Sequence, residues 1–381
     1  MAHLMATRFW LVAIFIGITV TGTFSDVVGS LYDQQEVEPS RPTKSFENLD
    51  RDKDGWIDRD EWPRALNPAI FRRLDKDRDG KISKVEHQSI QRDRKLTRPG
   101  RRQRRLPTGT IIKENLVYAS VEGRDLPLDL YLPKSDKPTP LVFWVHGGGW
   151  QSGSKASGGP GLLPLLERGY AVASVEYRLS GEAIFPAAIE DCKAAVSFLR
   201  LNAAKFNLDP KRFGAWGASA GGHLVSLLGT TGDTVEFNSH PVTQSESSQI
   251  QAVCNWFGPS DFLRMNDFPS VIDHDAANSP ESRFIGAPIQ RVPEKTNRAN
   301  PGRYASSDDP PFLHIHGDKD RLVPFNQSEI LHQALLNAGV ATTLYKVENG
   351  GHGFGESNKT ANEMIEKSIH FFDTHLLNQK R

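Results

Sequence analysis

Cysteine and net charge are scarce in this chain. Its 381 residues include two cysteines, and 46 Lys and Arg residues balance 46 Asp and Glu residues. Two cysteines are too few for a disulfide framework. Cys192 and Cys254 each lie in an apolar run, so we expect buried, unpaired thiols, although a disulfide between them would depend on geometry that sequence does not give. The zero net charge argues against nucleic acid or a strongly charged substrate as the partner.

The apolar run near the N-terminus is short. Phe9 to Val20 forms a twelve-residue block behind Arg8, whereas a membrane-spanning helix needs about 20 residues. Residues 1–25 therefore resemble a signal peptide, with an uncleaved anchor as the alternative. We expect a secreted or periplasmic protein with no transmembrane span after cleavage, followed by a polar, proline-containing linker over residues 26–45.

Two acidic stretches repeat one spacing of oxygen-bearing side chains. Positions 1, 3, 5, 6, 9 and 12 of a twelve-residue frame hold Asp50, Asp52, Asp54, Gly55, Asp58 and Glu61 in the first stretch, and Asp75, Asp77, Asp79, Gly80, Ser83 and Glu86 in the second. The backbone carbonyls of Trp56 and Lys81 fill position 7. This is the spacing of EF-hand loops, which surround Ca²⁺ with about six to eight oxygens. An acidic, solvated linker would not repeat the glycine and glutamate positions.

These loops predict a small, all-α EF-hand pair over residues 46–91. The loops begin 25 residues apart, so the helices between them, near 61–66 and 68–74, must be short. Ile57 and Ile82, both at position 8, should join the loops through a short strand contact. We expect the calcium to be structural, with no cofactor needed for catalysis.

A basic segment separates this pair from the rest of the chain. Residues 92–105 hold eight Lys or Arg residues and one acid, Asp93, with Pro99 and Gly100 in the middle. Such a run is typical of an extended, solvated linker, here residues 92–107. Binding of a polyanion or an anionic cell surface is the alternative.

Short apolar runs alternate with amphipathic helical patterns from residue 108 to residue 381. Residues 111–121 and 126–132 indicate an antiparallel start. The runs 141–145, 171–175, 212–216, 252–256, 312–315 and 342–347 are typical of buried parallel strands, with helices expected at 186–205, 220–228, 328–338 and 362–377. The pattern predicts an α/β domain, mostly parallel, whose ligands bind at the carboxyl ends of the strands.

A G-x-S-x-G motif, Gly217 to Gly221, directly follows one of these apolar runs. A serine exposed in a tight turn between a strand and a helix needs small flanking residues, so Ser219 is the candidate nucleophile. Alone, the motif is also consistent with an ordinary small-residue helix start.

Three consecutive glycines follow the strand 141–145, in His146-Gly147-Gly148-Gly149-Trp150. Such a loop can present backbone N–H groups to an oxyanion. We assign the donors to Gly148, Gly149 and Ala220; an ordinary glycine-rich turn is the alternative. A phosphate loop is disfavoured because no Gly-Lys-Ser/Thr follows.

Two further loops offer an acid and a base. His316-Gly317-Asp318-Lys319-Asp320 follows one strand, and Gly351-His352-Gly353 follows the last one. We expect His352 to be the general base and Asp320 to orient it, with Asp318 as the alternative acid. His146, His223 and His314 are expected to be structural, and His274 lies in a loop without an assigned role.

The order Ser219, Asp320, His352 is that of α/β hydrolases. Residues 107–381 resemble α/β-hydrolase esterases of the hormone-sensitive-lipase and carboxylesterase type, and are similar to bacterial acetylxylan and feruloyl esterases. The resemblance runs through residues 146–150, 176–179, 185–193, 217–221, 257–261, 279–282, 309–312, 316–320 and 351–354. It implies hydrolysis of small-molecule or polysaccharide esters through an acyl-enzyme.

The resemblance is less specific about the substrate. We expect the irregular, proline-dotted segment 259–309 to lie over the serine. Trp150, Phe257 and Phe354 are candidates for an apolar acyl or aryl pocket; each could equally be core, and core is favoured for Phe257. A peptidase of the prolyl-oligopeptidase type is an alternative, although residues 26–110 cannot build its propeller domain. A non-catalytic, calcium-dependent binding protein on a hydrolase scaffold is the other.

Overall fold

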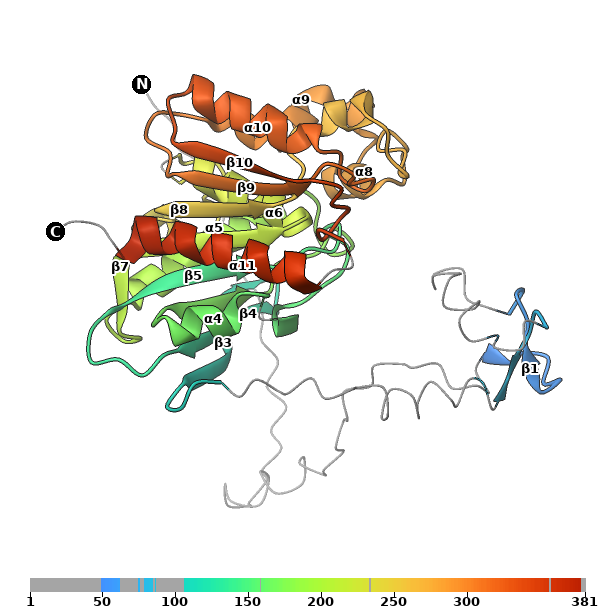
Figure 1. The fold of residues 1–381 in the computed structure, drawn as a ribbon, viewed down its shortest axis with the longest axis horizontal. Helices are drawn as coiled ribbons and strands as arrows, with labels where there is room; N and C mark the ends of the chain where they lie inside the picture. Colours follow the sequence, from blue (N-terminus) through green and yellow to red (C-terminus); the bar gives the residue numbers. More distant parts are fainter. Residues whose placement is uncertain are drawn as a thin grey trace, which may run out of the picture. The chain divides into compact units, whose positions relative to one another are not determined.

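The computed structural model describes residues 49–61, 75, 79–84, 86, 106–157, 159–232, 234–355 and 358–377. The chain divides into two units, residues 1–101 and 102–381 (Figure 1). The predictions for residues 1–25, 26–45 and 92–105, for the EF-hand helices and for Asp77 lie outside the described residues, and the domain boundaries stay predictions.

The N-terminal unit contains a two-stranded contact between the acidic loops. Strand β1 (Trp56–Ile57) pairs antiparallel with β2 (Ile82–Ser83), with Ile57 opposite Ile82. Both isoleucine side chains are fully buried. The predicted strand contact through position 8 of each loop is confirmed.

The C-terminal unit contains an eight-stranded sheet with the order β10-β9-β8-β7-β5-β6-β4-β3. Strand β4 pairs antiparallel with β3 and with β6, and all other pairs are parallel. The predicted antiparallel start and parallel remainder are therefore confirmed. The strands are β3 (Ile111–Val121), β4 (Arg124–Leu132), β5 (Thr139–Val145), β6 (Ala171–Val175), β7 (Leu208–Ala218), β8 (Ala252–Trp256), β9 (Phe312–Gly317) and β10 (Thr342–Val347).

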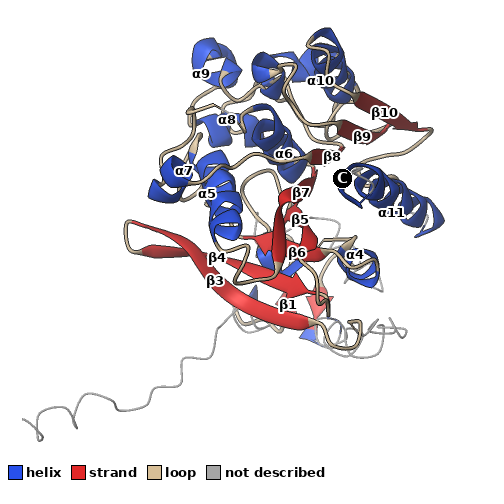
Figure 2. Cartoon of the chain, turned by 90° about the vertical axis from the view of Figure 1, so that its left-hand side faces the viewer, coloured by secondary structure: helices blue, strands red, loops and turns tan. Residues whose placement is uncertain are grey.

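Helices cover both faces of the sheet (Figure 2). One face packs on α5 (Ala187–Leu201), α6 (Ala220–Thr230) and α10 (Asn326–Asn337), and the other packs on α4 (Leu162–Glu167) and α11 (Asn358–Phe372). Because both faces are covered, every residue of β5 is buried, as is usual for a central parallel strand. The short α7 (Pro241–Ser245) packs beside α5. This is the predicted arrangement of a mostly parallel sheet flanked by helices.

The segment after β8 differs from its predicted irregular form. It folds into short helical turns, and proline stands at the first or second helical position of three of them. Proline there lacks only an N–H that would be unpaired anyway, so the prolines begin turns instead of breaking them. The turns are η2 (Phe262–Asp267), α8 (Pro280–Ile285), η3 (Ile289–Arg291), α9 (Pro293–Asn297) and η4 (Pro301–Tyr304).

Two smaller findings concern the C-terminal helix and the thiols. Helix α11 begins at Asn358, four residues before the predicted start, and continues into a π-helical turn, η5 (Asp373–Leu377). Cys192 and Cys254 are buried and unpaired, as predicted.

None of the helices in the described part of the chain is both long enough and apolar enough to cross a bilayer.

Candidate active site

Ser219 occupies a sharp turn between β7 and α6. Its φ of 55° and ψ of −124° lie in a region that side-chain-bearing residues rarely adopt. The turn is close-packed on both sides: a Cβ at Gly217 would lie 2.2 Å from the carbonyl oxygen of Gly221, and one at Gly221 would lie 2.1 Å from that of Val145. The glycines of the motif are thus required by close backbone approach.

A cavity of about 290 Å³ brings the predicted chemical groups together. Ser219, Ala220, Gly148, Gly149 and His352 all line it. They come from three separate segments at the carboxyl edge of the sheet, which follow β5, β7 and β10. The predicted site has six residues: the nucleophile, the base, the acid that orients the base, and three oxyanion donors. Five of these six line one cavity.

The sixth residue, Asp320, lies behind the histidine. Its Oδ2 is 2.7 Å from Nδ1 of His352. The other oxygen, Oδ1, accepts hydrogen bonds from the backbone N–H groups of Leu322 and Val323 at 2.8 and 3.0 Å. A carboxylate in this position accepts a hydrogen bond from the Nδ1–H group, which leaves Nε2 of the neutral imidazole free to accept a proton.

A second histidine contacts the same carboxylate, and sequence reasoning did not single it out. His316 Nε2 lies 3.3 Å from Asp320 Oδ2 and 2.9 Å from the carbonyl oxygen of Val323. Burial alone would raise the pKa of Asp320, but the hydrogen bonds from His316 and His352 outweigh it and hold that pKa well below its usual range. Asp320 is therefore ionised throughout the physiological range. The signal in the sequence was the place of His316 at the end of β9, four residues before Asp320.

Asp318, the alternative acid, is placed differently. Its backbone N–H donates to the carbonyl oxygen of Val347, and its Oδ1 has no hydrogen-bond partner among the described residues. Of the two aspartates, Asp320 is the one in contact with His352.

The histidines expected to be structural are buried and engaged elsewhere. His223 Nε2 donates to the carbonyl oxygen of Ala299 at 2.7 Å, and burial lowers the pKa of His223 to about 4. His146 stacks on Tyr177, with ring centroids 4.4 Å apart. His314 is fully buried in β9.

The three aromatic residues expected near the substrate divide into two groups. Trp150 lines the cavity and stacks on Phe284, with centroids 4.7 Å apart. Phe257 and Phe354 are absent from the lining and pack in the apolar core on the α11 side. Phe354 is therefore core, which was the equal alternative for this residue, and its ring packs edge-on against Trp256. Phe257 is core, as favoured, and its ring also meets the edge of His352.

The segment 259–309 contributes to the cavity, as predicted. Pro259, Ile272, Pro280 and Glu281 line it together with Ser219. Helix α8 begins with Ser279, whose side chain accepts a hydrogen bond from the Ser282 N–H at 3.0 Å. This cap places Glu281 in the first turn, at the cavity wall.

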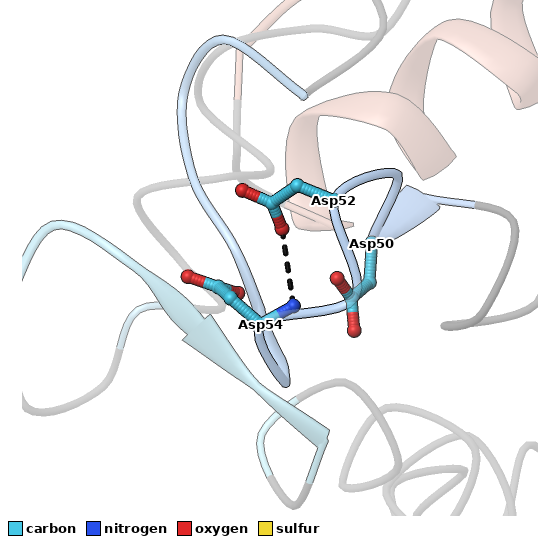
Figure 3. Close-up of side chains that lie close together, drawn as sticks. All are labelled: Asp50, Asp52 and Asp54. Atoms are coloured by element: carbon cyan, nitrogen blue, oxygen red, sulfur yellow. Dashed lines mark hydrogen bonds between the residues drawn. The ribbon is translucent and has the colours of Figure 1, made fainter.

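In the N-terminal unit, the first acidic loop groups three carboxylates. Oxygens of Asp50, Asp52 and Asp54 lie within 4.8 Å of one another (Figure 3). Asp50 is buried, and its Oδ1 has no hydrogen-bond partner among the described residues. A buried, unpaired carboxylate oxygen fits a cation ligand. Both oxygens of Glu61 accept backbone hydrogen bonds from the same loop, from Arg51 at 2.6 Å and from Asp58 at 3.3 Å.

The second loop repeats these features where it is described. Asp75 is buried with an unpartnered Oδ1, and its Oδ2 accepts from the Gly80 N–H at 3.1 Å, as Asp50 accepts from Gly55 at 3.2 Å. Ser83 donates to Glu86 Oε2 at 2.8 Å. The donor set of both loops therefore fits a hard cation such as Ca²⁺.

Comparison with known proteins gives matches for both units. The family model described as BD-FAE matches residues 128–335, and the EF hand model matches residues 43–66 and 68–86. Esterase LipQ of Mycobacterium tuberculosis is 28% identical over 259 residues, covering 66% of this chain and 59% of LipQ. Esterase LipC of the same organism is 30% identical over 228 residues, covering 57% and 54%. The chain thus spans little more than half the length of these curated relatives.

Solved structures match about 70% of this chain, and two of the three described here are matched over nearly their whole length. A truncated carbohydrate esterase from gut microbiota has a TM-score of 0.62 and 32% identity, covering 70% of this chain and 97% of its own. Esterase Est2 of Thermogutta terrifontis with butyrate bound has a TM-score of 0.58 and 26% identity, covering 72% and 97%. A bifunctional GH43-CE protein of Bacteroides eggerthii has a TM-score of 0.60 and 35% identity, covering 69% and 38%.

Proposed function

Because this chain belongs to the BD-FAE family, an esterase family with the α/β-hydrolase fold, we propose that it is a serine carboxylic-ester hydrolase. The observation that carries the proposal is the contact of 2.7 Å between His352 Nδ1 and Asp320 Oδ2, beside a cavity that His352 shares with Ser219. A base oriented by an ionised acid, next to a serine in a strained turn, is the arrangement that serine acyl transfer needs.

The proposed reaction proceeds through an acyl-enzyme. His352 Nε2 takes the Ser219 proton while Oγ attacks the ester carbonyl, and the tetrahedral oxyanion accepts hydrogen bonds from the N–H groups of Gly148, Gly149 and Ala220. The C–O bond to the alcohol then breaks, and the alcohol leaves with the proton from His352. Water then attacks the acyl carbonyl while His352 takes a proton from it. The bond to Ser219 Oγ breaks, His352 returns the proton to Oγ, and the carboxylic acid leaves. Asp320 holds the imidazole tautomer and stabilises the imidazolium.

The proposed substrates are short acyl or aryl esters such as those attached to polysaccharides. A likeness to a carbohydrate esterase supports the carbohydrate part, and a likeness to an esterase with bound butyrate supports the short acyl group. The size of the cavity, about 290 Å³, is consistent with a small group.

Active-site labelling tests the reaction type. We expect a fluorophosphonate probe to label the wild-type chain at Ser219 and to leave Ser219→Ala unlabelled. No labelling of the wild type would favour a non-catalytic binding protein. Side-by-side assays of acetylated xylan, feruloylated arabinan, short nitrophenyl esters and a proline-containing peptide amide then separate the esterase from a peptidase. Turnover of the amide alone would favour the peptidase.

For the N-terminal unit we propose structural Ca²⁺ binding in the two acidic loops, held by Asp50, Asp52, Asp54, Asp58 and Glu61 and by their counterparts in the second loop. The match to the EF hand model and the unpartnered oxygens of Asp50 and Asp75 support this.

We also propose export directed by residues 1–25. Fractionation of expressing cells tests this proposal, and retention of the protein in the cytoplasm would contradict it.

A further inference from the structure

Glu281 is a buried carboxylate in the wall of the cavity that the proposed reaction does not use. The residue is 3% exposed and lines the same cavity as Ser219 and His352. Among the described residues that line the cavity, Glu281 and His352 alone carry ionisable side chains. Glu281 Oε2 is buried and has no hydrogen-bond partner within the described chain. A carboxylate oxygen in this state costs stability unless a ligand satisfies it.

The other oxygen of Glu281 faces a buried histidine. His274 is 1% exposed, and its Nδ1 lies 3.1 Å from Glu281 Oε1. The contact has the distance of an ion pair without the angles of a hydrogen bond, since Nδ1 has no hydrogen-bond partner in the described part of the chain.

The hydrogen bonds of Ser270 show which ring nitrogen of His274 carries a proton. The Ser270 hydroxyl donates to the carbonyl oxygen of Arg321 at 2.9 Å, so its Oγ accepts from His274 Nε2 at 3.1 Å. His274 Nε2 therefore carries a proton. A neutral imidazole would then turn the lone pair of Nδ1 toward the carboxylate, which is repulsive. A proton between His274 Nδ1 and Glu281 Oε1 removes this repulsion, and the pair then carries no net charge, whichever of the two groups holds the proton.

The loop that carries His274 is fixed in place. The His274 N–H donates to Asn266 Oδ1 at 3.1 Å, and Asn266 Nδ2 donates to Asp273 Oδ1 at 3.0 Å. The Val271 N–H donates to the carbonyl oxygen of Arg321, in the loop that follows Asp320. These bonds fix His274, and with it Glu281, in one position before a ligand binds. Binding therefore carries a smaller entropy cost from ordering the Glu281 side chain.

We propose that Glu281 is a specificity-determining residue that accepts a hydrogen bond from a hydroxyl group of the ester substrate. The inference rests on the proposed ester hydrolysis at Ser219. A neutral hydroxyl fits better than a cation, because the pair of Glu281 and His274 carries no net charge. Trp150, which also lines the cavity, carries a matching donor: its Nε1 is buried without a hydrogen-bond partner among the described residues. A hydroxyl both donates and accepts, so it suits a wall with one free acceptor and one free donor.

The substrate class that follows is a hydroxylated ester, with the hydroxyl on the alcohol or on the acyl part. The remaining lining is mostly apolar, with Ile272, Leu322, Val323 and two prolines. An ester without a hydroxyl leaves Glu281 Oε2 buried and unpaired, which is how a polar site discriminates against a shape-matched analogue.

Two matched ester pairs test the proposal. The first is a monoacetylated methyl xyloside against the same acetate with its free hydroxyls methylated, and the second is 4-nitrophenyl glycolate against 4-nitrophenyl propionate. We expect Glu281→Gln to lower kcat/KM for the hydroxylated member of at least one pair by about tenfold to a hundredfold. We expect the hydroxyl-free member to change by less than about threefold. Because the kcat/KM of the variant is divided by that of the wild type for each ester, differences in the intrinsic reactivity of the esters cancel.

A matched control is Asp191→Asn. Asp191 Oδ1 lies 3.1 Å from His240 Nε2, a comparably buried carboxylate–histidine contact, and neither residue lines the cavity. This variant should change both members of each pair equally. Equal losses for both members in Glu281→Gln, with Ser219 still labelled by the fluorophosphonate, would overturn the role of Glu281 alone. An unlabelled, inactive wild type would instead overturn the proposed function.

A measurement on the wild type covers the case in which Glu281→Gln does not fold. Free methyl xyloside should inhibit hydrolysis of a nitrophenyl ester more strongly than its permethylated ether does. Acetylcholine, which is cationic and has no hydroxyl, should show no preference over neutral 3,3-dimethylbutyl acetate. Equal inhibition by the sugar and its ether, or a preference for the cationic ester, would contradict the proposal.

Discussion

Asp320 Oδ2 lies 2.7 Å from His352 Nδ1 while Asp320 Oδ1 accepts two backbone N–H groups. All the contacts of this carboxylate favour its charged form, which explains why its pKa stays low despite burial. The histidine is therefore held by an acid that does not itself take up the proton.

Replacing this acid should remove most of the activity. We expect Asp320→Asn to lower kcat by about a thousandfold or more, because an amide can stabilise the wrong imidazole tautomer and does not stabilise the imidazolium. The matched control is Asp318→Asn, two residues away and without the contact to His352. Steady-state kinetics on a nitrophenyl ester measures both. A larger loss for Asp318→Asn would assign the acid to Asp318.

The turn at Ser219 should tolerate no added side-chain atom. We expect Gly221→Ala to lower kcat by about a hundredfold, because its Cβ would lie 2.1 Å from the Val145 carbonyl oxygen and push the serine from its position. Gly351→Ala is the control: this glycine precedes His352, yet a Cβ there meets nothing within 4 Å. Melting temperature and kcat should be measured together, and similar losses in both variants would contradict the role of close packing.

Burial of His314 should make the protein less stable in acid. Burial, with a smaller effect from the nearby His332 and His316, lowers the pKa of His314 from its usual 6.5 to about 3. Below pH 6.5 the unfolded chain binds a proton at His314 that the folded chain does not bind. The free energy of unfolding therefore falls with falling pH, by up to about 1.4 kcal/mol per pH unit from this residue.

The variant His314→Gln should show a shallower loss of stability between pH 6.5 and pH 4 in urea unfolding. His370→Gln, at an exposed position on α11, should keep the wild-type pH dependence. An unchanged slope in His314→Gln would mean that other groups cause the acid sensitivity.

The sequence predicted most of the fold because the sheet is buried on both faces. Each central strand is a short, continuous apolar run, and each predicted strand occurs within a few residues of its expected bounds. The motif glycines and the chain order of Ser219, Asp320 and His352 also placed the candidate site. Local sequence patterns were enough to locate the candidate site because each of its residues lies in a loop after a strand or at the start of a helix.

The missed features depend on contacts between distant segments. His274 and Glu281 meet in a part of the chain where the loop 266–275 is tied to the loop after β9. Likewise, Phe354 follows the glycine loop of His352, but its side chain turns into the core beside Trp256. Spacing along the chain does not give the direction of a side chain in an irregular loop, so these contacts required the structure.

Calcium binding should depend on Glu61 and should be separable from ester hydrolysis. An EF-hand glutamate at position 12 binds Ca²⁺ through both oxygens, so we expect Glu61→Gln to weaken binding at the first loop by about tenfold or more, measured by calorimetry. Asp60→Asn, at the adjacent position 11, is the control and should bind as the wild type does.

A chain beginning at Arg105 should hydrolyse the ester equally well with and without chelator, because the acidic loops and the candidate triad belong to different units. Loss of its activity in chelator would reveal a second metal site within residues 105–381.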